Sequence, residues 1–115
     1  MDERIEKAFQ TANYMASLGN LRKVALEELN QSLIYYSQGS SFTITRELIT
    51  FINTLISVGQ QEAIVLDDNN IPCDIKNLAE FFTKILSIYS EATNNYLVKY
   101  AEIKTKRRVE GLLEL

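Results

Sequence analysis

Hard oxygen ligands are concentrated in one short stretch of the chain. Asp67, Asp68, Asn69 and Asn70 follow one another, and Asp74 comes four residues later. Carboxylate and amide oxygens are the ligands that Ca²⁺ and Mg²⁺ accept. The stretch lacks the spacing and the closing Glu of an EF-hand, and a hairpin turn also requires Asp and Asn. We expect a turn without bound metal, and a metal-dependent site for phosphate or nucleotide is the alternative.

Basic side chains are concentrated near the C-terminus, just after two tyrosines. Such a segment resembles a patch that contacts a nucleic-acid backbone and stacks bases on aromatic rings. Tyr96 and Tyr100 also continue an apolar helix stripe, however, and cations near a helix C-terminus offset its dipole. We expect a solvated helix end and keep nucleic-acid binding as the alternative. The candidate nucleic-acid patch consists of Lys99, Lys104, Lys106, Arg107 and Arg108.

The composition excludes most catalytic templates. The chain has no histidine, which removes Ser-His and Cys-His nucleophile pairs and His-ligated zinc. Cys73 is the single cysteine, so no disulfide can form within the chain. The acids Glu80, Glu91 and Glu102 fall on exposed helix positions rather than converging on a cleft. We expect no enzymatic activity and no cofactor.

Length and charge indicate one soluble domain. The 115 residues are 46% hydrophobic, and the net charge of -3 creates no field that would attract polyanions. No window approaches the length of a membrane span, and the first residues do not resemble a signal peptide. We expect a cytoplasmic protein that does not bind membranes.

The C-terminal third predicts one long amphipathic helix, from about residue 75 to residue 112. Asp74 is the expected N-cap. Apolar side chains recur at steps of three and four, which places them on one face of a helix. This stripe consists of Leu78, Phe82, Ile85, Tyr89, Ala92, Tyr96, Tyr100 and Ile103.

A second long helix is expected from about residue 2 to residue 37, with Asp2 as its N-cap. Gly19 interrupts it, but one glycine costs a helix only about 1 kcal/mol, so we favour a continuous helix over a break. Its main apolar stripe begins at Ile5 and continues through Ala12, Met15 and Leu26.

The middle of the chain predicts smaller elements, so the fold class is α+β and mostly α. Thr45 can cap a short helix over about 46–58, which Gly59 ends. Two short apolar runs, about 62–66 and 71–74, surround the polar turn and predict a β-hairpin. Residues 42–44 could add a third strand to this hairpin.

Two helices of about 36 residues would each be about 54 Å long, which exceeds the dimensions of a compact domain. We expect a single elongated helical domain, residues 1–115, that forms a homo-oligomer, either a dimer or a larger assembly. Apolar residues mostly off the main stripes, together with the end of the last helix, are the candidate interface: Tyr14, Leu18, Leu21, Tyr35, Tyr96, Tyr100 and Ile103. The tail, residues 109–115, could dock into a partner, fold back or fray.

Several segments resemble small hypothetical proteins of marine T4-like bacteriophages, including cyanophages. They are residues 42–44, 65–72, 96–100 and 104–108. The resemblance covers most of the chain and implies a setting in the cytoplasm of an infected host or in a virion. It implies no assigned activity, so no functional residues are transferred. We expect a non-enzymatic, self-associating protein that acts through protein–protein contacts in phage assembly or host takeover; a nucleic-acid-associated accessory protein is the alternative.

Overall fold

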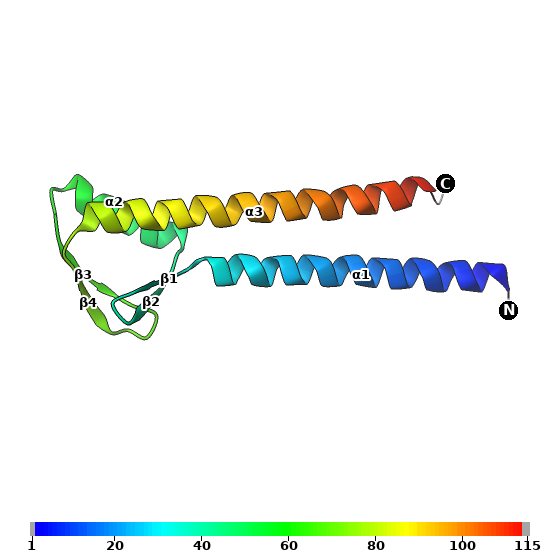
Figure 1. Cartoon of the computed structure of the whole chain (residues 1–115), viewed down its shortest axis with the longest axis horizontal. Coiled ribbons are helices and arrows are strands. Elements are labelled where there is room, and N and C mark those ends of the chain that lie inside the picture. The colour runs from blue at the N-terminus through cyan, green and yellow to red at the C-terminus, as the bar shows by residue number, and fades with distance from the viewer. Residues whose placement is uncertain (1, 114–115) are drawn as a thin grey trace. The chain divides into compact units, whose positions relative to one another are not determined.

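The computed structural model describes residues 2–113, with side chains described up to Arg107. In chain order the elements are α1 (Glu3–Ser32), β1 (Ile34–Ser37), β2 (Ser40–Thr43), α2 (Arg46–Ser57), β3 (Ala63–Leu66), β4 (Pro72–Ile75) and α3 (Leu78–Leu113) (Figure 1). The predicted fold class, mostly α with a small β component, is confirmed. None of the helices in this described part is long and apolar enough to cross a membrane.

The chain divides into two units, which we describe separately. The terminal unit comprises the residues up to Leu29 and those from Asn94 onward, and the middle unit is Asn30–Thr93. The single elongated domain expected from the sequence stays a prediction.

The first helix is continuous but shorter than expected. The Asp2 carboxylate accepts a hydrogen bond from the main-chain N–H of Arg4 at 3.1 Å, so the predicted N-cap is confirmed. The helix passes through Gly19 without a break, as we favoured. It ends at Ser32, however, and the expected extension to residue 37 is wrong.

Residues 34–37 form strand β1, which pairs antiparallel with β2. Gln38 and Gly39 both have positive φ, 52° and 78°, as a two-residue hairpin turn requires. Aromatic residues then lie opposite each other, Tyr35 beside Phe42. This cross-strand pairing overrides the helical spacing of the same residues. Because β2 pairs with β1, residues 42–44 do not add a strand to the second hairpin, and that expectation is wrong.

The predicted short helix is confirmed as α2. The Thr45 hydroxyl accepts a hydrogen bond from the Leu48 N–H at 3.1 Å, which caps the first turn. Gly59, with φ of 88°, follows the last turn, and its N–H donates to the Ile56 carbonyl at 3.0 Å. A left-handed residue at this position ends the helix without side-chain strain.

The second predicted hairpin is confirmed as β3 and β4, but the following helix begins later than expected. Asp74 lies inside β4, opposite Ile64, so it is not a helix cap. The side chain of Asn77 takes that role and accepts a hydrogen bond from the Glu80 N–H at 3.1 Å. Helix α3 consequently starts at Leu78 rather than near residue 75.

The core of the middle unit collects apolar side chains from both hairpins, from α2 and from the first turns of α3. Within this unit α2 lies beside the start of α3 (Figure 1). Tyr35 and Phe42 meet the Phe81 ring edge-on, with ring centroids 5.7 and 5.3 Å apart. The buried core residues are Phe42, Ile44, Ile52, Val65, Ile75, Leu78, Phe81 and Ile85.

Replacing Ile52 tests this core. Ile52 is fully buried, so we expect Ile52→Ala to lower the free energy of unfolding by about 2–5 kcal/mol in a denaturant titration followed by circular dichroism. Its neighbour Phe51 is exposed, and Phe51→Ala should change stability by only about 0.5 kcal/mol. Equal losses for the two variants would contradict the assigned faces of α2.

Candidate interaction surface

The acidic stretch that resembled a metal site forms a closed turn between β3 and β4. The Asp67 carboxylate accepts hydrogen bonds from the main-chain N–H groups of Asn69 and Ile71, at 2.9 and 2.8 Å. Asn70 adopts a positive φ of 61°, which an asparagine tolerates. Asp67 is buried, so these donors replace water around its charge.

Asp68 attaches this turn to the other hairpin. Its N–H donates to the Ser41 carbonyl at 2.9 Å, and its carboxylate accepts from the N–H and the hydroxyl of Thr43, at 2.8 and 3.1 Å. The main-chain groups of Ser41 and Thr43 face away from β1 in this register. Asp68 thus occupies the free edge of β2 much as a short strand would.

These contacts lower the pKa of the Asp67 carboxyl group. Its pKa lies below the ordinary aspartate value, chiefly because of the Ile71 N–H, with help from the Asn69 N–H and the Ser40 hydroxyl and against the effect of burial. Among the described residues no three acidic or cysteine side chains gather as metal ligands. The alternative of a metal site at Asp67, Asp68 and Asp74 therefore has no geometric support.

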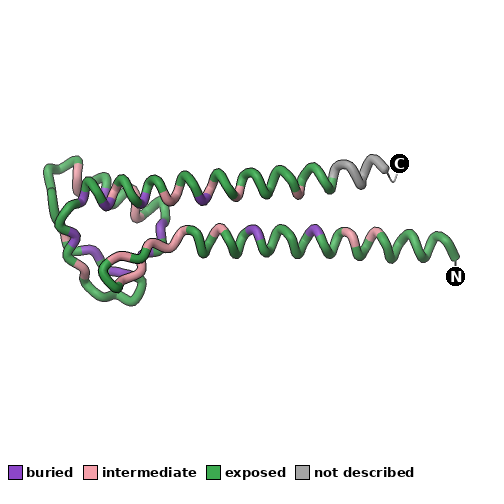
Figure 2. The backbone as a smooth tube through the Cα atoms, viewed as in Figure 1, coloured by how far each residue is buried: buried purple, intermediate pink, exposed green. Residues whose placement is uncertain are grey.

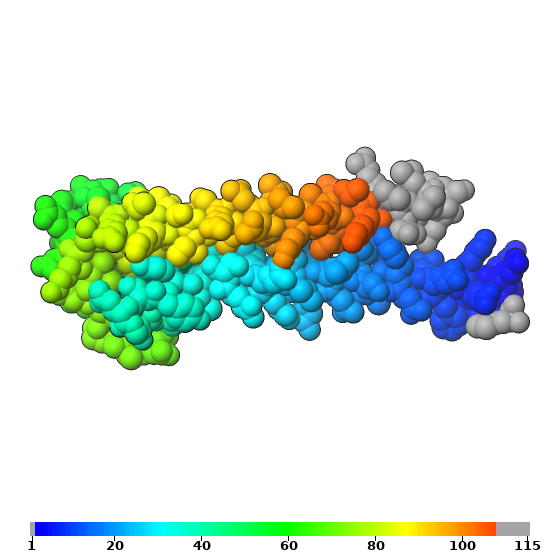
Figure 3. Space-filling view, in the orientation of Figure 1, coloured from blue at the N-terminus to red at the C-terminus, as the bar shows by residue number. Residues whose placement is uncertain are grey.

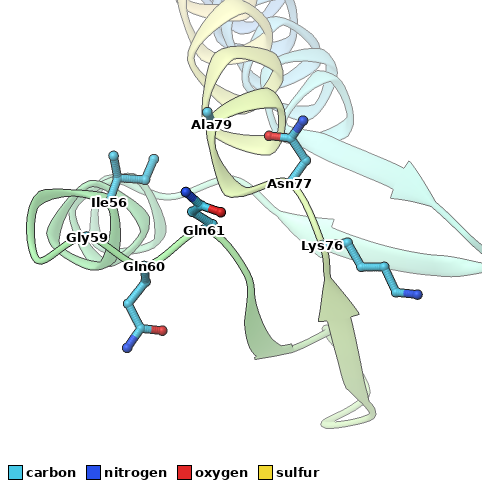
Figure 4. A pocket seen from close by; sticks show the side chains of 7 residues that line it. All are labelled: Ile56, Gly59, Gln60, Gln61, Lys76, Asn77 and Ala79. Atoms are coloured by element: carbon cyan, nitrogen blue, oxygen red, sulfur yellow. The ribbon is translucent and has the colours of Figure 1, made fainter.

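A surface depression lies between the end of α2 and the start of α3 (Figure 4). Its volume is about 550 Å³, and its lining is Ile56, Gly59, Gln60, Gln61, Lys76, Asn77 and Ala79. The Gln61 side chain projects between the two helices, whereas those of Gln60 and Lys76 point away (Figure 4). The Asn77 side chain already accepts the hydrogen bond from the Glu80 N–H that caps α3. The depression therefore presents no convergent set of reactive groups.

In the terminal unit α1 packs against α3 through one face, which we call the inner face. The side chains of the two helices fill the space between them (Figure 3). Leu18 is only 6% exposed, and the Tyr14 hydroxyl donates to the Lys106 carbonyl at 2.8 Å. The inner face consists of Thr11, Tyr14, Leu18, Ala25 and Leu29.

Charged contacts line the same seam. Lys99 forms an ion pair with Glu28, and the Arg22 guanidinium lies 5.9 Å from the centre of the Tyr100 ring. Both contacts are partly exposed, so each contributes little energy. They lie on the faces of α1 and α3 that meet.

The seven residues of the candidate interface are therefore already in contacts within one chain. Tyr14 and Leu18 lie on the inner face, and Leu21 and Ile103 line a small depression of about 220 Å³. Tyr96 packs beside Tyr100, with ring centroids 6.1 Å apart. Tyr35 is partly buried and packs against the core of the middle unit. Their role between chains stays a prediction.

The candidate nucleic-acid patch is divided by the structure. Lys99 is paired with Glu28. Lys104, Lys106 and Arg107 are exposed, but residues two apart on a helix point to opposite sides, which separates Lys104 from Lys106. The side chain of Arg108 and the tail, residues 109–115, lie outside the described side chains.

Another side of α1 carries exposed apolar side chains. Ile5 is 47% exposed, Phe9 58% and Met15 43%, although Ile5 and Met15 belong to the main apolar stripe of the predicted helix. They stay exposed because α3 packs against a different face of α1, the inner face. Figure 2 shows α1 exposed along most of its length. We call this surface the outer stripe and define it as Ile5, Phe9, Ala12, Met15, Ala16 and Gly19.

One sequence signal could have identified the outer stripe. From Ala8 to Leu21 the chain has no charged residue, so both the inner and the outer side of this helix segment lack charge. A surface helix ordinarily carries charge on the side away from its partner. The absence of charge all around the helix indicates two contact surfaces rather than one.

Asp67→Asn tests the role of the turn. Because the folded-state pKa is lowered, the charged carboxylate stabilises the fold above the ordinary value of about 3.8, and this contribution disappears as pH falls through the folded-state pKa. We expect Asp67→Asn to lower the melting temperature at neutral pH, with the difference vanishing in acid. Asp74→Asn, on the exposed side of β4, is the control. Identical neutral-pH melting of Asp67→Asn and the unmodified chain would refute the assignment.

A pair of leucine variants tests the orientation of α1. Leu18 is buried and Leu26 is 40% exposed. We expect Leu18→Ala to reduce the free energy of unfolding by about 2 kcal/mol or more, and Leu26→Ala by about 0.5 kcal/mol. Thermal and denaturant unfolding measure both. A larger loss of unfolding free energy for Leu26→Ala than for Leu18→Ala would mean that the side of α1 with Leu26, and not the inner face, is buried.

Comparison with protein-family models, with curated protein sequences and with solved structures finds no match. Function therefore has to be inferred from the surfaces of the chain itself. The outer stripe is one such surface.

Proposed function

We propose that this chain is a non-enzymatic protein that self-associates and acts through protein–protein contacts. The observation that carries the proposal is the outer stripe of α1. It places half-exposed Ile5, Phe9 and Met15 in one row, with Ala12 between them and with Ala16 and Gly19 continuing the row. A continuous apolar row on a helix is a surface that other proteins recognise.

The three large side chains alone do not account for strong association. Full burial of a large apolar side chain contributes about 1.5–3 kcal/mol, so each half-exposed side chain can contribute about 1 kcal/mol more. Two copies would supply six such side chains, or about 6 kcal/mol, against a cost of at least about 4 kcal/mol for the loss of translational and rotational freedom. A micromolar complex corresponds to about 8 kcal/mol, so the proposal requires further contacts beside the outer stripe.

The placement of the acidic residues supports the non-enzymatic part of the proposal. Asp67 accepts main-chain hydrogen bonds within its turn, and Asp68 holds the edge of β2. Their carboxylates are committed to structure. In the setting that the resemblance to phage proteins implies, the protein would work in the host cytoplasm or in a virion, in assembly or host takeover.

The mass in solution tests the proposal. The chain has a mass of 13.2 kDa, and we expect light scattering over a micromolar concentration series to give at least twice that value. Phe9→Glu places a charge in the outer stripe, where burial would be costly, and should shift the protein to the monomer.

The matched control is Phe51→Glu. Phe51 is also about half exposed but belongs to the middle unit, so this variant should keep the mass of the unmodified chain. A monomer at every concentration for the unmodified chain would end the proposal.

A further inference from the structure

We infer that the outer stripe is a contact between two copies of this chain, in which α1 packs antiparallel against the α1 helix of the second copy about a two-fold axis next to Ala12. The inference rests on the self-association proposed above. It adds the surface that forms the contact and the orientation of the partner.

The first support is the pattern of side-chain sizes along the stripe. Ala12 is its midpoint, seven residues from both Ile5 and Gly19. Antiparallel pairing about this midpoint places Ile5 opposite Gly19 of the second copy. Phe9 then lies over Met15 and Ala16. Large side chains from each helix meet small or flexible ones from the other, so the helices can approach closely.

The glycine can accept this neighbour. A Cβ built on Gly19 would meet no atom within 4 Å, so the space above it is open in the single chain. The same openness holds along the stripe, where Ala12 and Ala16 are exposed. A parallel pair would instead stack Phe9 on Phe9 and leave Ala16 and Gly19 facing their own counterparts. Such a pair would hold the helices apart at one end and leave space at the other.

The second support is charge. Asp2 precedes Phe9 by seven residues and Lys23 follows Ala16 by seven, so both lie on the face of the outer stripe, one at each end. Asp2 is ten residues before Ala12 and Lys23 eleven after it. Antiparallel pairing brings Asp2 of each copy next to Lys23 of the other. Parallel pairing would place like charges together at both ends, which opposes that orientation.

The third support is that these end charges are accessible. Asp2 and Lys23 are both exposed, and no charged residue lies between Ala8 and Leu21 to interfere with the apolar contact. The exposed ion pairs add little affinity, so they select the orientation while the apolar stripe supplies the attraction.

Disulfide trapping tests the geometry. Two helices in close contact have axes about 8 Å apart, which brings facing Cα atoms within about 4–6 Å, the range that a disulfide spans. In a Cys73→Ser chain, which has no other thiol, Ala12→Cys should therefore link two copies under oxidised glutathione. Ser17→Cys is the control, because Ser17 is exposed on another side of the same helix.

We expect Ala12→Cys to cross-link roughly 100-fold faster than Ser17→Cys at micromolar concentration, because pairing raises the effective thiol concentration to millimolar. Orientation is tested by mixing two single variants. Ile5→Cys and Gly19→Cys should link to each other and not each to itself. Circular dichroism confirms that each variant is folded before oxidation.

The outcomes distinguish the antiparallel α1 contact from self-association through another surface. An assembly by light scattering in which Ala12→Cys links no faster than Ser17→Cys would overturn this inference and leave self-association standing. Self-linking of Ile5→Cys would overturn the antiparallel orientation. A monomer at every concentration would overturn the contact together with the proposed function.

Discussion

The middle unit depends on the attachment of its two hairpins through Asp68. A two-stranded hairpin is marginally stable alone, and this unit contains two that share no strand. Asp68 joins them because its N–H and its carboxylate satisfy two outward-facing main-chain groups of β2. Asp67 fixes the turn that presents Asp68. The hydrophobic core, in which Phe81 touches rings from β1 and β2, can then form against one combined layer.

The terminal unit is limited because it contains only two helices that can pack against each other. Two helices have one seam, so a helix with apolar residues on two sides can bury only one of them within the pair. In α1 the inner face, with Leu18, packs against α3, and the Tyr14 hydrogen bond and the ion pair of Glu28 with Lys99 lie along the same seam. The outer stripe remains exposed because α3 covers only the inner face of α1.

Local signals in the sequence were sufficient for most of the fold, and non-local pairing accounts for the errors. Thr45 and Gly59 mark α2 at both ends, so that helix could be predicted. Residues 34–37 continued a helical spacing, and only their pairing with β2, which no local pattern contains, makes them a strand. Asp74 and Asn77 are both suitable caps, and the choice between them depends on where the pairing of β3 and β4 ends. Likewise, periodicity revealed apolar rows on α1 but not which row α3 covers.

The candidate site was harder to predict than the fold because it is defined by what the chain leaves exposed. The same residue types, Ile5 or Phe9, form a core or an interface depending on the position of a second helix. The middle unit uses its acidic side chains to complete its own hydrogen bonds, whereas the terminal unit leaves apolar area exposed to water. Exposed apolar area lowers its free energy only when something covers it. The outer stripe, with Asp2 beside one end and Lys23 beside the other, is a surface that a second copy of the chain in antiparallel orientation can cover.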